Sequence, residues 1–445
     1  MHNEGVEQDE IFELYTKQQA FEYLARHYSD KAPEISYLKK YFADDEIYRG
    51  NIEKIDRVLE KAPFAVTNRD LTEKLYGKNI KISASQLEKF SLCPFQYFCG
   101  YGLRAKERRV SEIDPIQFGN IVHYFLEKFL FIHKNDALSK IPDDEIRRDV
   151  DEILLEFADE NFGGLEGKSS SFINLFNRTK INIFELIKQI IRQFESSDFK
   201  PADFELKIGD DGDIPAYKVN IDNECSVSVR GFIDRVDTLE KNDDESYVRI
   251  VDYKTGNKEF KLYEILYGIN MQMLIYLRAL TENGSEYYGK KLIPAGILYM
   301  PSSAKTIDGI AYDTEEKITK ERDNNFKMNG LILNDSDVIN HMDRLGSHIK
   351  VKSKMEDGKY SSTVADSEQF RQIFKHIDDT IRSMGEKLLS GNVAARPIKG
   401  VADGCAYCPY DSVCCREYDD DYNYCDKASP KEVYTTISGE EEDDG

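Results

Sequence analysis

The chain has 445 residues, of which 40% are hydrophobic and 32% charged, and its formal net charge is −22. This is enough for two or three domains of a soluble globular protein, and no apolar run approaches the roughly 20 residues that a membrane span needs. The strongly acidic balance argues against nucleic acid as the main partner, although a basic groove can coexist with an acidic surface.

The N-terminal part, residues 1–80, is predicted to be helical and polar, with its clearest amphipathic stretch at 9–28. The start has no basic region followed by an apolar core, so we expect no secretory signal. We therefore expect a cytoplasmic protein. No G-x-x-x-x-G-K-[ST] loop occurs, which excludes a nucleotide-driven motor by that criterion. Ser85 and Glu88 form a capping-box pattern that predicts a helix from Gln86.

Helical periodicity dominates the next hundred residues, and short β-type runs follow it. Helices are expected at 116–134, 145–162, 172–197, 260–281 and 367–391, and strands at 204–209, 217–221, 225–234, 247–254 and 293–300. The last of these strands is apolar throughout, as in a buried parallel strand. Residues 431–445 are predicted to be a disordered acidic tail. The order indicates an α/β fold with a mixed sheet flanked by helices.

Two predicted strands end in charged residues. Asp234 ends the run "SVRGFID" at 228–234, Asp252 ends "VRIVD" at 248–252, and Lys254 follows two residues later. Asp252 and Lys254 are two residues apart, so they point to one face of an extended chain. Two carboxylates on neighbouring strands suit Mg²⁺, and a lysine beside them suits phosphoryl chemistry. The alternative is a solvated hairpin with a weak ion pair.

Two helices carry further candidates. His123 shares a helix face with Gly119 and Glu127, so it is either a metal ligand or half of a surface His–Glu pair. Gln272 and Tyr276 lie four residues apart, directly after the strand with Asp252. They either contact a substrate phosphate or base or belong to ordinary amphipathic helix surface.

The cysteines cluster near the C-terminus. Cys405 and Cys408 form a C-x-x-C pair, and Cys414 follows after five residues. Three soft ligands in one loop indicate a metal centre. A fourth ligand is missing from this loop, because Cys415 adjoins Cys414 and adjacent residues rarely bind one centre. If Cys93, far away in the sequence, completes the site, the centre closes a long loop of the chain. The alternative is a set of buried cysteines that bind no metal. Four thiolates fit zinc or an iron–sulfur cluster equally well.

Together these motifs resemble one family. Their order in the chain is Cys93, "FGNIVHYFLEKF", "GFIDRVD", "VDYKTG", "QMLIY" and "CAYCPYDSVC". This is the order of the iron–sulfur PD-(D/E)XK nucleases, and the opening stretch "LYGKNIKISASQLEKFSLCPFQYFCGYGLRAKER" is similar to that of the AddB-type nuclease domains of AddAB helicase–nucleases. The resemblance covers about residues 75–420.

The resemblance implies a role for each matching residue. It implies a restriction-endonuclease-like domain over 81–425, a remnant of a helicase-like region over 1–80, and the following site residues. Metal ligands are His123, Asp234, Asp252 and the Tyr253 carbonyl; the catalytic lysine is Lys254; DNA contacts are Gln272 and Tyr276; ligands of a [4Fe–4S] cluster are Cys93, Cys405, Cys408 and Cys414.

The implied activity is Mg²⁺-dependent exonuclease hydrolysis of single-stranded DNA, in double-strand break repair by homologous recombination. The implied partners are DNA ends and an AddA-type helicase–nuclease. A full AddB has a long helicase-like region before this point, whereas about 75 residues precede the match here. The chain is therefore either a fragment of a longer protein, the product of a split gene or an excised domain, and we expect processive degradation of duplex DNA to need a partner motor. The alternatives are a non-catalytic iron–sulfur scaffold that binds DNA or AddA, and a zinc-stapled protein of unrelated function.

Basic residues cluster locally in "LRAKERR" at 103–109. We expect Arg104, Lys106, Arg108 and Arg109 to line the DNA path, because phosphate contacts need local positive charge in a chain that is acidic as a whole.

Overall fold

The structure is a computed structural model. It describes residues 16–59, 65–105, 115–133, 138–254, 256, 258–302, 314, 324–351, 360–414, 416 and 421–439. The chain divides into two compact units, Met1–Phe64 and Ala65–Gly445. Within the described ranges, every helix is too short or too polar to span a bilayer.

The first unit contains three short helices, α1 (Lys17–Arg26), α2 (Pro33–Ala43) and α3 (Arg49–Leu59). Thr16 and Gln19 form the capping box that starts α1, and a proline at the first position starts α2. Leu24, Ile35 and Phe42 are buried between the helices. This unit is therefore helical, as predicted for the N-terminal part.

The helical N-terminal unit ends earlier than the predicted residue 80. The helix α4 (Arg69–Tyr76) and the strand β1 (Asn79–Ser83) belong to the second unit. The buried Thr72 hydroxyl of α4 donates to the carbonyl of Leu389 over 2.9 Å, and β1 pairs with the central sheet. The sequence did not reveal this because both contacts join residues that lie far apart in the chain.

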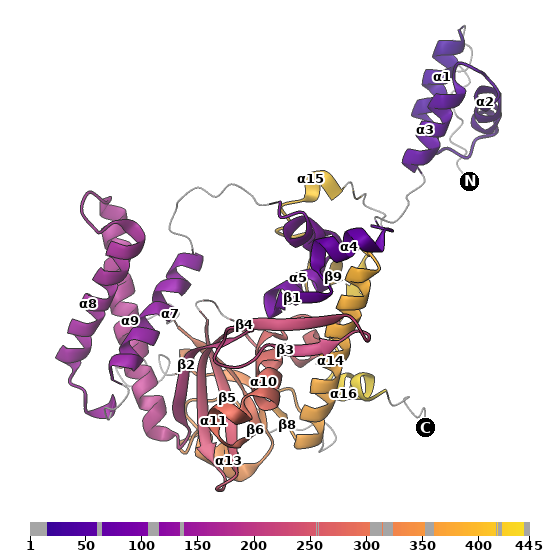
Figure 1. Cartoon of the computed structure of the whole chain (residues 1–445). Helices are drawn as coiled ribbons and strands as arrows, with labels where there is room; N and C mark the ends of the chain where they lie inside the picture. The colour runs from indigo at the N-terminus through magenta and orange to yellow at the C-terminus, as the bar shows by residue number, and fades with distance from the viewer. Residues whose placement is uncertain are drawn as a thin grey trace. The chain divides into compact units, whose positions relative to one another are not determined.

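The second unit is built on a mixed sheet in the order β1-β4-β5-β6-β7-β8, with β2 and β3 also paired to β4 (Figure 1). Its further strands are β2 (Lys200–Ile208), β3 (Tyr217–Asn220), β4 (Ser226–Glu240), β5 (Glu245–Lys254), β6 (Lys291–Pro301), β7 (Asn329–Leu333) and β8 (Val364–Ala365). The predicted mixed α/β fold is confirmed, and β6 is buried and parallel to β5, as its apolar run predicted.

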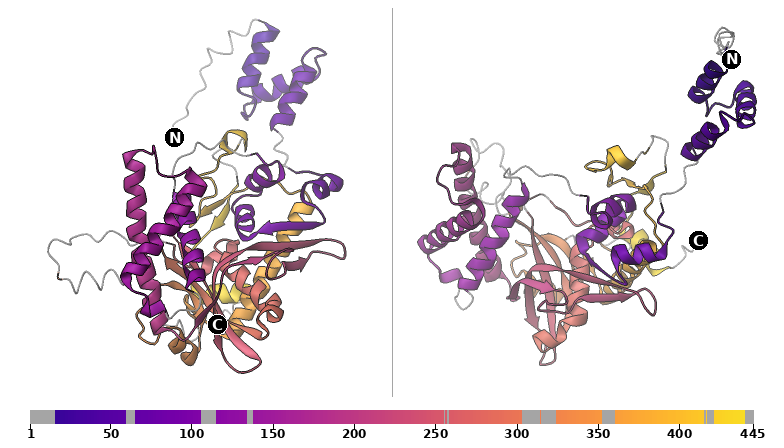
Figure 2. Two further views of the ribbon diagram at one scale, coloured as in Figure 1. Left: turned by 60° about the vertical axis from the view of Figure 1, so that its left-hand side comes forward. Right: turned by 45° about the horizontal axis from the view of Figure 1, so that its top comes forward.

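Besides α4, the second unit contains further helices, some of which pack against the sheet. They are α5 (Ala84–Leu92), α6 (Pro94–Tyr97), η2 (Phe98–Gly102), α7 (Pro115–Ile132), η3 (Leu138–Lys140), α8 (Asp143–Phe162), α9 (Ser170–Ser196), η4 (Leu262–Tyr267), α10 (Gln272–Asn283), α11 (Ser285–Tyr288), α13 (Ser336–Met342), α14 (Ser367–Leu389), α15 (Asp411–Cys414) and α16 (Pro430–Ser438). α7, α8 and α9 pack together beside β2 (Figures 1 and 2), and a small parallel pair, β9 (Ile398–Gly400) and β10 (Asn423–Cys425), lies near the C-terminus.

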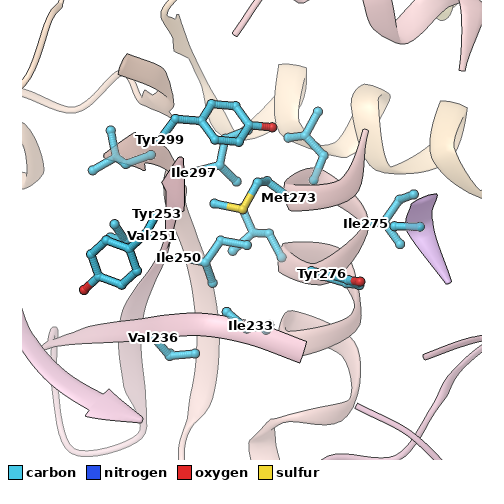
Figure 3. Close-up of a cluster of buried hydrophobic side chains, with 14 of the residues drawn as sticks. Ile233, Val236, Ile250, Val251, Tyr253, Met273, Ile275, Tyr276, Ile297 and Tyr299 are labelled. Carbon is cyan, nitrogen blue, oxygen red and sulfur yellow. The ribbon is translucent and has the colours of Figure 1, made fainter. Parts of the chain in front are cut away.

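The core between α10 and the sheet fixes the strands that carry the candidate site. Ile250 of β5 points toward Met273 of α10, whereas the side chains of Val251 and Tyr253 leave the strand on the other side (Figure 3). This alternation is the normal pleat of a strand. It places Asp252, between Val251 and Tyr253, on the same face of β5 as Ile250.

The strand β4 is longer than predicted, and this corrects the expected position of Asp234. β1 pairs with β4 as far as Ser83 and Arg230, and β5 pairs with it from Val251 and Arg235 onward. Asp234 therefore lies in the middle of a 15-residue strand, where one edge of β4 changes partner. A change of partner depends on contacts distant in sequence, so the local pattern gave no sign of it.

Two local predictions are also corrected. The helix α5 begins at Ala84, because the capping box is formed by Ser83 and Gln86 rather than by Ser85 and Glu88. Residues 431–438 of the expected tail lie in α16, in which Tyr434 is buried and stacks on Tyr360 with ring centroids 5.6 Å apart. Packing of this kind stabilises the helix, and the acidic run of the predicted tail begins only after it, at 440–444. Residues 440–445 lie outside the described residues.

Candidate active site

Three ligand-type side chains meet next to the point where β4 changes partner. His123 of α7, Glu205 of β2 and Asp234 of β4 offer nitrogen and oxygen atoms that all lie within 4.8 Å of one another. His123 Nδ1 is 3.2 Å from Glu205 Oε1 and 3.5 Å from Asp234 Oδ1. An imidazole and two carboxylates from three different elements form a possible binding site for a divalent cation.

Glu205 was not predicted as a site residue. Its ladder neighbours pair as Phe204 with Arg235 and Leu206 with Ile233, so the register places Glu205 opposite Asp234. Its φ of 49° is unusual for a residue other than glycine in a strand and marks a local irregularity of β2. The sequence offered one indication of this role, namely that Glu205 is an acidic residue within the predicted strand 204–209.

The two aspartates are tied together through the backbone. The N–H of Tyr253 donates a hydrogen bond to Asp234 Oδ2 over 2.9 Å. Asp252, the residue before Tyr253, is nearly buried, and its Oδ2 lies 2.7 Å from Lys254 Nζ. Asp252 and Lys254 thus share one face of β5, as their spacing predicted. The ring of Tyr253 meets that of His123 edge to face, with centroids 6.3 Å apart.

The electrostatics of the site reflect crowded negative charge. Burial, and then the charge of Asp252, raises the pKa of Asp234 to about 7. Burial alone would lower the pKa of His123, but the hydrogen bond to Glu205 and the charges of Asp234, Glu205 and Asp252 raise it to about 9. Acidic groups that raise one another's pKa favour a bound cation, which would relieve their repulsion.

The chemistry of the donor set fits a hard divalent cation. Asp252 Oδ2 is buried and accepts no hydrogen bond with good geometry from the described residues, although the Lys254 ammonium is close to it. Such an oxygen has a lone pair available for a metal ion. The carboxylates of Asp234 and Glu205 and the imidazole of His123 face the same space.

Gln272 and Tyr276 approach the site from α10. Gln272 is the first residue of this helix, and Tyr276 is buried. Burial, and then the charges of Asp234 and Asp252, raises the pKa of Tyr276 to about 12, whereas a hydrogen bond with Gln272 lowers it. The Tyr276 hydroxyl occupies the space beside Gly231, where an added Cβ would lie only 2.1 Å from it. The predicted pair is thus beside the carboxylates.

A fully buried ionic network supports the strands behind the site. The Asp237 carboxylate accepts hydrogen bonds from Arg235 and from Arg249, each over 2.9 Å. Arg235 also donates to the Tyr253 hydroxyl over 3.0 Å. Arg235 follows Asp234 and Tyr253 follows Asp252 in the sequence, so this contact holds β4 and β5 together directly behind the two aspartates.

The structure brings Cys93 to the C-terminal cysteine loop. Cys93 is buried between α5 and α6, where Phe95 N–H donates to the carbonyl of Ala394 over 3.2 Å. Burial and the neighbouring Cys408 raise the pKa of Cys93. Hydrogen bonds from the backbone of Gln96, Phe95 and Arg396 act in the opposite direction and lower this pKa. Backbone donors that point at a sulfur suit a thiolate ligand. The roles of these cysteines as ligands stay a prediction.

One further cysteine, Cys99, lies at the same place and was not predicted. It is buried, and Cys408 and Cys414 contribute, after burial, to raising its pKa. Tyr410 of the loop donates to the carbonyl of Ala105 over 2.7 Å and so joins the two segments. Cys415 lies outside the described residues, as do Lys106, Arg108 and Arg109 of the predicted basic cluster; Arg104 is described, with a φ of 55°.

Comparison with known proteins agrees with this geometry. The sequence profile of the PD-(D/E)XK nuclease superfamily matches residues 81–415. Three similar curated proteins are each named as a subunit of an ATP-dependent helicase/deoxyribonuclease. The protein of Clostridium acetobutylicum is 34% identical over 390 residues, 84% of this chain and 33% of that protein. Those of Clostridium novyi and Thermoanaerobacter sp. are 31% and 32% identical, over 88% and 91% of this chain and 35% and 36% of theirs.

The chain thus spans about a third of the length of the curated relatives it matches. The profile match covers most of the chain and includes α7, β4, β5 and α10, which carry the candidate site. The chain therefore belongs to the PD-(D/E)XK nuclease superfamily, and it is homologous over most of its length to the AddB-type subunit of ATP-dependent helicase/deoxyribonucleases.

Proposed function

We propose that this chain is the nuclease part of an AddAB-type helicase–nuclease, a Mg²⁺-dependent exonuclease that hydrolyses single-stranded DNA during double-strand break repair by homologous recombination. The observation that carries the proposal is the convergence of His123, Glu205 and Asp234 beside the Asp252–Lys254 ion pair. Partners of the proposed assembly are DNA ends and an AddA-type helicase–nuclease, in a cytoplasmic setting.

His123, Asp234 and Asp252, with the Tyr253 carbonyl, are the residues that would hold Mg²⁺, and Glu205 adds a further carboxylate that the sequence did not predict. When bound, Mg²⁺ polarises a phosphoryl oxygen and lowers the pKa of a bound water. The Tyr253 N–H fixes Asp234 Oδ2, so the other carboxylate oxygen, Oδ1, is the one that faces His123.

Lys254 and the α10 pair act on the substrate. The Lys254 ammonium is held in place by Asp252 at 2.7 Å and can stabilise negative charge that develops on the phosphate during hydrolysis. Gln272 and Tyr276 contact the DNA strand next to the scissile phosphate in this proposal. Tyr276 is a neutral hydrogen-bonding group near pH 7, which lies far below its raised pKa of about 12.

We also propose that Cys93, Cys405, Cys408 and Cys414 hold a [4Fe–4S] cluster with a structural role. Soft thiolates from the two ends of the nuclease domain and backbone donors at Cys93 support it. When bound, the cluster crosslinks segments that are hundreds of residues apart, which restricts the unfolded chain.

The test is digestion of end-labelled single-stranded DNA by the whole chain, purified without oxygen, in Mg²⁺. We expect degradation of linear strands, protection of circular strands of the same sequence, and loss of activity in Asp252→Ala. Cleavage of circles at the same rate would contradict an exonuclease. DNA binding without any cleavage by the folded wild type would favour the non-catalytic scaffold.

A further inference from the structure

Among the residues that the structure describes, one edge of β4 has no strand partner beside the candidate active site. β1 leaves β4 after Arg230, β5 joins it at Arg235, and between them β4 pairs only with β2 on its other edge. Asp234 lies in this gap, and so do Gly231 and Phe232. Residues 231–234 therefore border the carboxylate site along this edge.

Phe232 is exposed in this gap. Its side chain is 52% exposed, and it is the one large apolar residue of the eight-stranded sheet that is exposed among the residues the structure describes. Exposure alternates along the strand, with Arg230 and Phe232 exposed and Val229 and Ile233 buried. Arg230, Phe232 and Asp234 therefore share one face of β4.

The residues on either side of Phe232 pack against their neighbours. Gly231 abuts the buried hydroxyl of Tyr276, and Ile233 is packed in the core. The cross-strand neighbour of Phe232 is Lys207, whose ammonium is paired with Asp211 at 2.8 Å. Phe232 thus presents its ring on β4 beside a lysine whose charge is paired with a carboxylate.

We infer that Phe232 is a stacking platform for a nucleobase of the single strand whose phosphate lies at the carboxylate site. This inference rests on the proposed nuclease function and adds a substrate-contacting residue to it. Two residues of a strand span about 7 Å, so the ring lies close enough to Asp234 to hold a nucleotide adjacent to the scissile phosphate.

Stacking of this kind selects for single strands. A base in a duplex already has both faces covered, whereas a single-stranded base has a free face, and an aromatic ring accepts any of the four bases. This suits an acidic chain in particular, because stacking supplies affinity that does not depend on net positive charge. Arg230, on the same face, makes no ion pair within the described ranges and is available to a phosphate.

The test measures binding separately from cleavage. Affinity of the full chain for a fluorescein-labelled single strand and for a blunt duplex is measured by anisotropy with Ca²⁺ in place of Mg²⁺. The variants are Phe232→Ala, Phe232→Trp and, as an exposed-aromatic control, Tyr424→Ala; Tyr424 is 69% exposed and lies on β10, in the separate two-stranded sheet. A strand carrying 2-aminopurine reports stacking directly, because its fluorescence is quenched by a stacked ring. Thermal unfolding of each variant checks folding.

We expect Phe232→Ala to bind the single strand roughly tenfold more weakly, with less 2-aminopurine quenching, an unchanged melting temperature and unchanged duplex binding. Phe232→Trp and Tyr424→Ala should bind as the wild type does. Equal single-strand affinity of Phe232→Ala and wild type would overturn the inference, and Mg²⁺-dependent cleavage by the wild type would then still support the nuclease. In the opposite case, weaker binding by Phe232→Ala without any cleavage by the wild type would support the stacking platform and contradict the nuclease.

Discussion

The backbone N–H of Tyr253 donates a hydrogen bond to Asp234 Oδ2 over 2.9 Å, across the place where β4 and β5 begin to separate. In a regular β-ladder, a backbone carbonyl of the neighbouring strand would accept this hydrogen bond. Here the side chain of Asp234 accepts it instead. It sets the orientation of Asp234, whose other oxygen faces His123 at 3.5 Å. The geometry of the candidate site thus depends on the position at which the pairing of β4 with β5 ends.

Glu205 should matter for metal-dependent activity as much as a predicted ligand does. We expect Glu205→Gln to reduce Mg²⁺-dependent cleavage by about 10- to 100-fold, because the amide loses the charge that faces His123 and Asp234. Initial rates over a Mg²⁺ titration measure this. Glu240→Gln, an exposed pair with Lys290 on the same sheet, is the control and should keep full activity; equal rates for both variants would remove Glu205 from the site.

Stability without a divalent cation should fall as pH rises. The pKa of Asp234 is raised from its ordinary 3.8 to about 7 in the folded chain, so folding favours its protonated form. Its contribution to the free energy of unfolding is therefore lost as the pH rises from 3.8 to about 7. The pKa of His123 is raised from 6.5 to about 9 in the folded chain. Its contribution to the free energy of unfolding is therefore lost as the pH rises from 6.5 to about 9.

Thermal unfolding in EDTA from pH 5 to pH 9 measures this dependence, and the melting temperature should decrease throughout. Asp234→Asn should flatten the part below pH 7, whereas Asp244→Asn, at an exposed position, should not. A melting temperature that rises with pH in EDTA would contradict the raised pKa values.

The buried network should respond asymmetrically to substitution. Asp237→Ala leaves the guanidinium groups of Arg235 and Arg249 buried without their shared carboxylate, so the free energy of unfolding should fall by about 3–5 kcal/mol. Arg235→Met leaves Asp237 paired with Arg249 and should cost less. Urea unfolding compares them, and a larger loss for Arg235→Met would show that the charge balance does not control stability here.

Gly231 should tolerate no side chain. A Cβ there would lie 2.1 Å from the Tyr276 hydroxyl, so Gly231→Ala should lower the free energy of unfolding by about 1–3 kcal/mol and reduce cleavage. Adding Tyr276→Phe removes the nearest clashing atom and should recover part of the stability. The same urea titration tests it, and no recovery in the double variant would place the conflict elsewhere.

The cysteine site should hold iron. Cys408→Ala should lose visible absorbance and bound iron, and its free energy of unfolding should fall by roughly 5 kcal/mol, the loop-entropy value for a crosslink of this span. Cys225→Ala, a buried cysteine on the central sheet side of the domain, is the control and should retain iron. Bound zinc with no iron in anaerobically purified wild type would exclude the cluster.

Sequence patterns predicted the elements that depend on local order. Helical spacing of apolar residues predicted α7, in which Phe125 and Phe129 are buried. The alternation of side chains along a strand predicted that Asp252 and Lys254 share one face. Glu205 was missed because it reaches His123 only through pairing of β2 with β4, across 82 residues of sequence. Cys99 was missed for the same kind of reason, since folding of η2 brings it to the loop.

The measurement that tests the proposed active site most directly is calorimetric titration of the metal-free chain with Mn²⁺, a stand-in for Mg²⁺, in wild type and Asp234→Ala, with Asp244→Ala as the exposed control. We predict at least one site in wild type and the control that is lost or weakened at least about tenfold in Asp234→Ala. Equal binding by all three proteins would mean that the cation does not bind where β4 and β5 part, and the proposed active site would be wrong.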